Sequence, residues 1–95
     1  MDAIHKKYKK PIIITEFGAD TVSGMHSVSD QMFIEEYQNK LITKYIDLFW
    51  RKKYVIGEHI WNFTDFRTTM HFRKVLLNLK GVFTWERQPK SVALY

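Results

Sequence analysis

A glutamate ends the most apolar run of this chain. Ile12, Ile13 and Ile14 are consecutive, Glu16 follows two residues later, and Gly18 comes after it. Three isoleucines in a row leave no polar face, which favours a strand covered on both sides, as in parallel sheets. The carboxyl edge of such a sheet is where α/β enzymes place their catalytic groups. Glu16 is therefore a candidate catalytic carboxylate, although such a glutamate, taken alone, is more often a helix cap or an ion-pair partner.

Glycosidase chemistry at Glu16 requires a second carboxyl group. In glycoside hydrolysis one carboxylate attacks or activates water, and the other carboxyl group protonates the leaving oxygen. Asp20, Glu58 and Asp65 are the local candidates for this second group. Asp20 and Asp65 fall in expected loops, and their spacing identifies neither of them as an acid. Glu58 lies in the middle of an expected strand, which indicates a buried partner of a basic residue.

Two further segments carry side chains suited to a sugar site. Trp61 ends the second expected strand. Core packing is the usual role of such a tryptophan, but at that position it also stacks on sugar rings. Asn78 and Lys80 are two residues apart, so both point to one side of an extended segment. The pair is suited to hold an anionic group, although a solvated lysine is the commoner case.

The composition argues against several other kinds of site. The four histidines lack metal-ligand spacing, and the chain has neither cysteine nor a glycine-rich phosphate loop, so we expect no metal and no cofactor. The net charge of +5 is assigned to solvated ends of elements rather than to a nucleic-acid partner. No run of about 18 apolar residues and no apolar leader occur, so neither a membrane span nor a signal peptide is expected. The lack of cysteine fits a cytoplasmic location.

The spacing of apolar and cap-forming residues predicts how these groups are positioned. A long loop is expected over residues 18–29, which are rich in turn formers. Ser29 or Asp30 would cap a helix that runs to about Trp50. An apolar stripe at three- and four-residue spacing is expected to form its buried face, with Phe33, Tyr37, Leu41, Tyr45 and Leu48 as members.

A second strand is expected over Tyr54–Trp61. Strand, helix and strand form a βαβ unit of an α/β fold, with parallel strands and a right-handed crossover. Because parallel strands end on one side, Glu16 and Trp61 should emerge at the same edge. Residues 64–78 are expected to be irregular, residues 81–84 extended, residues 88–90 a turn, and residues 91–95 the first turn of a helix.

Three segments resemble the β-glucuronidases of glycoside hydrolase family 2. They are Pro11–Thr21, Val55–Phe66 and Asn78–Lys90, and their order and spacing also match. The resemblance implies a (β/α)₈ TIM barrel, of which residues 1–95 would be the C-terminal portion, about the last two βα units. It also implies retaining hydrolysis of β-D-glucuronides as part of a larger catalytic domain.

The same resemblance implies roles for individual residues. Glu16 would be the nucleophile of a double displacement, forming a glycosyl-enzyme intermediate. Asn78 and Lys80 match residues that hold the glucuronate carboxylate, and Trp61 matches an aromatic residue near the sugar. Lys74 stands where the family often has an arginine; lysine keeps the charge but loses the bidentate fork.

The family's general acid/base is a glutamate that follows an asparagine, and these 95 residues contain no Asn-Glu pair. The isolated chain is therefore expected to be inactive, with the rest of the catalytic domain or another copy of the chain as its partner. Two alternatives stay open: a non-catalytic βαβ module with a structural or sugar-binding role, and a family 2 enzyme for another sugar. The Asn78 and Lys80 pair favours an acidic sugar, because a neutral sugar has no carboxylate to hold.

Overall fold

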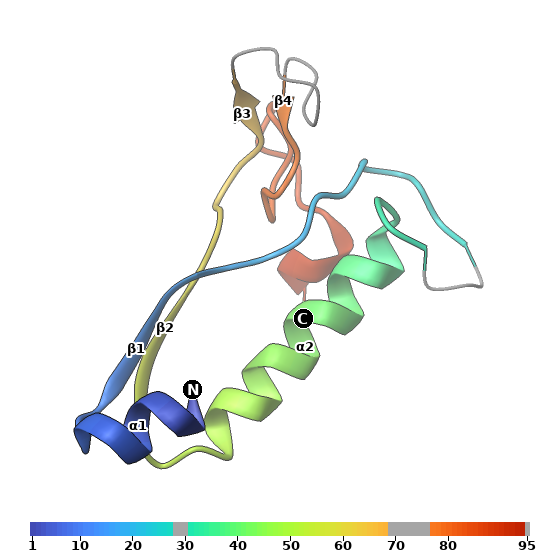
Figure 1. Cartoon of the computed structure of the whole chain (residues 1–95). Helices are drawn as coiled ribbons and strands as arrows, with labels where there is room; N and C mark the ends of the chain where they lie inside the picture. Colours follow the sequence, from blue (N-terminus) through green and yellow to red (C-terminus); the bar gives the residue numbers. More distant parts are fainter. Residues whose placement is uncertain (28–30, 69–76, 95) are drawn as a thin grey trace.

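The structure is a computed structural model that describes residues 1–27, 31–68 and 77–94. The described elements are α1 (Asp2–Tyr8), β1 (Ile12–Phe17), α2 (Glu35–Trp50), β2 (Val55–Ile60), β3 (Phe66–Arg67), β4 (Leu77–Asn78) and a 3₁₀ turn, η1 (Ser91–Leu94) (Figure 1). No helix in these ranges is long and apolar enough to cross a membrane.

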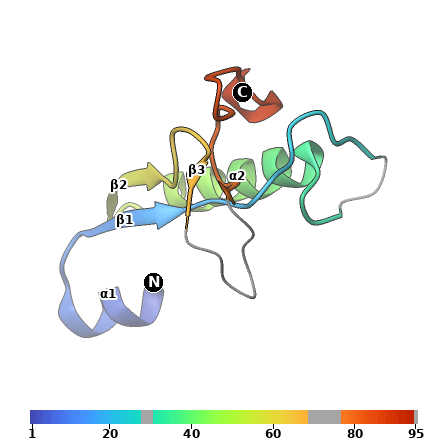
Figure 2. The same cartoon turned by 90° about the horizontal axis from the view of Figure 1, so that it is seen from above.

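β1, α2 and β2 form the expected βαβ unit. The two strands pair in parallel, with Ile12 opposite Val55 and Phe17 opposite Ile60. Figures 1 and 2 show the two strands side by side, with α2 along one side of the pair. The rings of Phe17 and Phe49 meet edge to face at 5.2 Å between centroids, at the centre of a small core. The α/β prediction and the parallel pairing are confirmed.

Only one face of the strand pair is covered by the described elements. Ile14 and Phe17 pack toward α2, whereas Ile13 is 53% exposed and Ile56 is 64% exposed. The expectation that the isoleucine run is covered on both sides is therefore wrong for the described chain. The physical reason lies in the TIM barrel that the sequence resemblance implies, where the inward face of a strand is packed only by side chains of the other strands.

Helix α2 begins at Glu35, later than the expected cap at Ser29 or Asp30, and those two residues lie outside the described ranges. Ile34 occupies the N-cap position and makes no side-chain capping bond. In place of a local cap, the Glu35 carboxylate accepts the N–H groups of Gly24 at 3.1 Å and Ser91 at 2.7 Å. The start of the helix is thus fixed by contacts distant in sequence.

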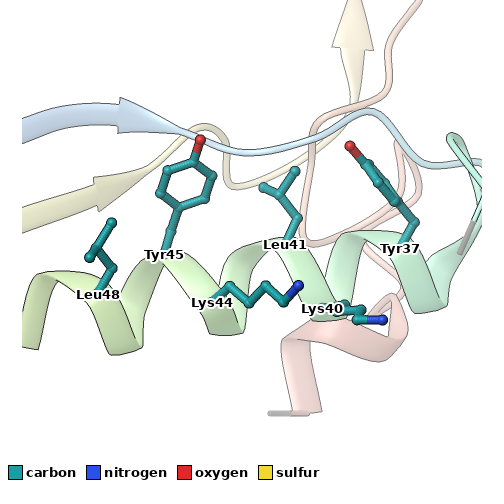
Figure 3. A pocket seen from close by; sticks show the side chains of 6 residues that line it. All are labelled: Tyr37, Lys40, Leu41, Lys44, Tyr45 and Leu48. Carbon is teal, nitrogen blue, oxygen red and sulfur yellow. The ribbon is translucent and has the colours of Figure 1, made fainter.

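The buried face of α2 also differs from the expected stripe. Ile42 and Phe49 are the buried apolar residues of the helix, whereas Tyr45 and Leu48 are both exposed. Phe33 precedes the helix and is exposed, so it is not part of the stripe. The other four residues of the expected stripe border an open groove of about 580 Å³, which is lined by Tyr37, Lys40, Leu41, Lys44, Tyr45 and Leu48 (Figure 3). Leu41 and Tyr45 of the stripe still contact the core, the Tyr45 ring at 5.9 Å from that of Phe17. The stripe is therefore a core-facing row as predicted, but the fully buried apolar residues belong to the neighbouring row.

The C-terminal third is more ordered than predicted. β3 and β4 form a short antiparallel pair, Phe66 opposite Asn78 and Arg67 opposite Leu77, inside the segment expected to be irregular. Single bridges join Phe83 to Thr64 and to Pro89. The expected helical turn near the end is present as η1, and Lys74 lies outside the described residues.

Candidate active site

Glu16 lies near the carboxyl end of β1 with an exposed side chain. Its carboxylate makes no hydrogen bond or ion pair with any described residue. It borders a hollow of about 370 Å³ whose walls include Ile14, Gly18 and Tyr45. Within the described chain, Glu16 is therefore neither a helix cap nor an ion-pair partner, and its carboxylate is open to solvent.

Trp61 follows β2 directly and lies beside the end of β1. Its N–H donates to the Phe17 carbonyl at 2.8 Å. Gly18 permits this approach, because a Cβ at Gly18 would lie 2.2 Å from the Trp61 carbonyl oxygen. Trp61 is 40% exposed, and its indole meets the Phe66 ring edge-on at 6.1 Å between centroids. The prediction that Glu16 and Trp61 emerge at one edge is confirmed.

The segment from Asn78 to Lys80 is tied to both strand ends through its backbone. The Lys80 carbonyl accepts the Asn62 N–H at 3.1 Å, and the Leu79 carbonyl accepts the Thr21 N–H at 2.9 Å. Asn78 is buried, and its Oδ1 accepts the Lys80 N–H at 3.0 Å. Oδ1 is thus engaged, and the Nδ2 group of Asn78 makes no hydrogen bond to another described residue.

The side chains of Glu16 and Lys80 open onto different hollows. Lys80 is half-buried and borders a hollow of about 200 Å³ with Asp20 and Tyr37. Gly18 and Leu41 lie in the walls of both hollows, so the two spaces adjoin. The backbone thus gathers Glu16, Trp61, Asn78 and Lys80 at one edge, but the described chain alone does not place the side chains of Glu16 and Lys80 in one cavity.

Asp20, Glu58 and Asp65 were the candidates for the second carboxyl group. The structure identifies none of them as a general acid that would act with Glu16. Asp65 is buried, pairs with the Lys90 ammonium at 2.8 Å and accepts the Gly81 N–H at 2.9 Å, a structural role. Asp20 accepts the Leu79 N–H at 3.3 Å. Glu58 is half-buried and forms no ion pair with a described residue, so its expected basic partner is absent there.

Two polar residues at this edge were missed by the sequence reasoning. Lys90, expected in a turn, is 0% exposed, and its ammonium is enclosed by protein acceptors. Asn62, which follows Trp61, is buried, and both polar atoms of its side chain lack a hydrogen-bond partner in the described chain. A buried amide without partners costs free energy, so Asn62 is a further candidate for contact with a bound group. No sequence signal marks either residue.

His26 connects the loop after β1 to the first turn of α2. Its Nε2 lies 3.0 Å from Glu35 Oε2, and its Nδ1 lies 2.8 Å from Glu36 Oε1. The hydrogen bond to Glu36, together with the charges of both carboxylates, raises the pKa of His26 above its ordinary value of 6.5. The imidazole, in its protonated form, thus ties to α2 a loop that begins only two residues after Glu16.

We expect the stability of the chain to fall as the pH rises through the folded pKa of His26. A raised pKa means that this contribution is complete below the unfolded value and is lost above the folded one. Melting temperatures measured from about pH 6 to 9 should therefore decline more for the native chain than for His26→Gln. The effect is small, because the imidazole is more than half exposed. Equal pH slopes for the two chains would contradict this role.

The described residues contain no cluster of three or more side chains that could hold a metal ion. The polar and aromatic groups that the carboxyl edge brings together are a carboxylate, a tryptophan, amides and an ammonium. This set suits the binding and covalent chemistry of a sugar acid.

The chain belongs to the glycosyl hydrolases family 2, TIM barrel domain, whose model matches residues 1–95. The resemblance to family 2 and the TIM-barrel fold class are thereby confirmed.

Individual relatives are similar over nearly the whole chain. A β-glucuronidase of Paenibacillus borealis is 47% identical over 89 residues, 94% of this chain and 15% of the relative. The solved β-D-glucuronidase of Dictyoglomus thermophilum matches with a TM-score of 0.90 and 51% identity, over 95% of this chain and 16% of that one. The Ruminococcus gnavus β-glucuronidase in complex with uronic isofagomine matches with a TM-score of 0.89 and 41% identity, over 98% and 16%. The chain therefore spans about one-sixth of the length of these proteins.

Proposed function

We propose that this chain contributes the nucleophile and the acid-sugar contacts to retaining hydrolysis of β-D-glucuronides, as part of a larger family 2 catalytic domain that includes residues 1–95. The observation that carries the proposal is the backbone linkage of three segments at one sheet edge. Phe17, next to Glu16, is bonded to Trp61; Asn62, next to Trp61, is bonded to Lys80.

Glu16 acts as the nucleophile in this proposal. Its carboxylate attacks the anomeric carbon as the bond to the aglycone oxygen breaks, and an ester to the sugar forms. The general acid that protonates the leaving oxygen comes from outside these residues, and water then hydrolyses the ester with inversion at the same carbon. Two inversions give net retention.

Lys80 and Asn78 select the acidic sugar. The Lys80 ammonium has no carboxylate partner in the described chain, and the Nδ2 group of Asn78 donates to no other described residue, while its Oδ1 accepts the Lys80 N–H. A carboxylate that accepts from both gains charge-assisted hydrogen bonds, which a neutral hydroxymethyl group cannot form. Trp61 offers a partly exposed ring for the sugar face. We assign Lys74 to the same carboxylate by its position in the family pattern.

The partner in this proposal is the remainder of the catalytic domain or another copy of the chain. Ile13 and Ile56 expose an apolar strand face, and the groove along α2 exposes a second apolar surface (Figure 3). Apolar surfaces of this kind usually mark contacts with other protein elements. A cytoplasmic location is part of the proposal, and the lack of cysteine supports it.

A segment graft tests the proposed function. The matching segment of the Dictyoglomus thermophilum enzyme is replaced by this chain, and hydrolysis of an aryl glucuronide and of an aryl galactoside is measured. We expect glucuronide turnover in the graft and none from the isolated chain. Lys80→Met should lower kcat/KM for the glucuronide about 10- to 100-fold, the value of a charge-assisted hydrogen bond.

The matched control is Lys10→Met, because Lys10 is exposed and lies before β1. It should leave kcat/KM unchanged, whereas galactoside hydrolysis should be indifferent to Lys80→Met. A graft that cleaves galactoside better than glucuronide would support a family 2 enzyme for another sugar. An inactive graft that folds would support the non-catalytic module.

A further inference from the structure

The ammonium group of Lys90 is completely buried and has three acceptors. Nζ donates to the Thr21 carbonyl at 2.8 Å, to Asp65 Oδ1 at 2.8 Å and to the Leu79 carbonyl at 3.0 Å. An ammonium has three protons, so every donor is used. The Nζ atom of Lys90 is therefore held in one position, and none of its protons is available for another hydrogen bond.

These acceptors come from the three segments that carry the proposed site. Thr21 follows the strand that bears Glu16, Asp65 follows Trp61 by four residues, and Leu79 is the residue between Asn78 and Lys80. A single buried cation thus connects the nucleophile segment, the tryptophan segment and the carboxylate-binding segment. Burial of a charge costs free energy unless the charge is well paired, so the three acceptors must keep a defined geometry around the Lys90 ammonium.

The peptide groups of Leu79 are held from every available side. Its N–H donates to Asp20 Oδ1 at 3.3 Å, and its carbonyl accepts from both Thr21 and Lys90. With the central residue fixed, the side chains of Asn78 and Lys80 leave the backbone in set directions. Loss of the Lys90 bond would free the Leu79 carbonyl on one side and allow this segment to shift.

We propose that Lys90 is a positioning residue for recognition of the substrate's carboxylate, acting through the Leu79 carbonyl on Asn78 and Lys80. The inference rests on the proposed function. Displacements of about 1 Å in positioning groups cost on the order of 100-fold in catalysis, so a bond at this point controls selectivity without touching the sugar. Asp65 is the counter-ion that keeps the ammonium in place.

The test compares two inhibitors in the grafted enzyme: uronic isofagomine, which carries a carboxylate, and isofagomine, its counterpart without the carboxylate. Lys90→Met removes the ammonium and retains much of the side chain. We expect the inhibition constant of uronic isofagomine to rise about 30-fold and that of isofagomine to change less than about threefold. Lys10→Met should alter neither constant.

A second variant separates positioning from folding. Lys90→Met alone leaves the Asp65 charge buried and unpaired, which destabilises the protein. The double variant Lys90→Met/Asp65→Asn removes both charges and keeps an acceptor for the Gly81 N–H. Its melting temperature should recover most of the loss, while its affinity for uronic isofagomine should stay low.

Each outcome supports or overturns the proposed positioning role of Lys90. Selective loss of the uronic inhibitor in both variants supports the inference. Equal weakening of the two inhibitors, recovery of uronic affinity in the double variant, or no change at all would overturn it while the proposed function stands. If the unsubstituted graft binds neither inhibitor and is inactive, the proposed function itself fails and the inference fails with it.

Discussion

Glu16→Gln should reduce glucuronide hydrolysis by the grafted enzyme about a thousand-fold or more, the scale seen when a covalent nucleophile is removed. Glutamine keeps the shape of the side chain but has a weakly nucleophilic amide oxygen, so the glycosyl ester cannot form. The measurement is kcat with an aryl glucuronide. Glu86→Gln is the matched control, because Glu86 is an exposed carboxylate outside the proposed site. A Glu16→Gln graft that keeps a tenth of the activity would contradict the assignment.

Chemical rescue distinguishes a nucleophile from a proton donor at the same position. In Glu16→Ala, azide should enter the vacated space and attack the anomeric carbon from that side, which gives an α-glucuronosyl azide. If Glu16 were the acid/base, the ester would still form on another carboxylate, and azide would give the β product. The configuration of the azide, read by NMR, therefore tests the role of Glu16 and not only its importance.

The strands of this fold were predictable because their signal is local. The isoleucine run before Glu16 and the apolar segment before Trp61 each contain the information that makes them strands. Once both are strands joined by a helix, parallel pairing and a shared carboxyl edge follow from chain connectivity. For that reason the placement of Glu16 beside the Trp61 segment could be derived without coordinates.

The start and the buried face of α2 could not be derived in the same way. Its first turn is held by Glu35, whose carboxylate accepts N–H groups from Gly24 and Ser91, 11 and 56 residues away. Two apolar rows lie side by side on the helix, and spacing alone does not say which row is fully buried. Ile42 and Phe49 of one row are buried, while Tyr45 of the other row contacts the Phe17 ring and also borders the open groove.

Lys90 illustrates a further limit of sequence reasoning. Two of its three acceptors are backbone carbonyls, which every residue possesses and which therefore leave no trace in the sequence. A lysine after a proline in a turn is normally solvated, and only the convergence of three distant segments buries this one. By contrast, Asn78 and Lys80 were identifiable because the amide and the ammonium that matter belong to their own side chains.

Gly81→Ala should destabilise the chain more than an alanine at any of its other glycines. A Cβ at Gly81 would lie 2.2 Å from the Asp65 nitrogen, 2.4 Å from the Thr64 carbonyl carbon and 2.5 Å from the Phe83 oxygen. All three are backbone atoms, so no side chain can rotate away to make room. We expect a loss of about 3–5 kcal/mol in unfolding free energy, in the range of severe steric substitutions.

Gly57→Ala is the matched control, because a Cβ there would lie 3.6 Å from Ile13 Cγ2, an ordinary contact. Its effect should stay within about 1 kcal/mol. For a chain of this size, a loss of 3 kcal/mol corresponds to a fall of roughly 12–24 °C in melting temperature, which circular dichroism resolves easily. Similar melting temperatures for the two variants would contradict the close backbone approach at Gly81. The graft carrying Gly81→Ala should also lose glucuronide selectivity. The reason is that Gly81 adjoins Lys80 and donates its N–H to the Asp65 carboxylate, which holds Lys90.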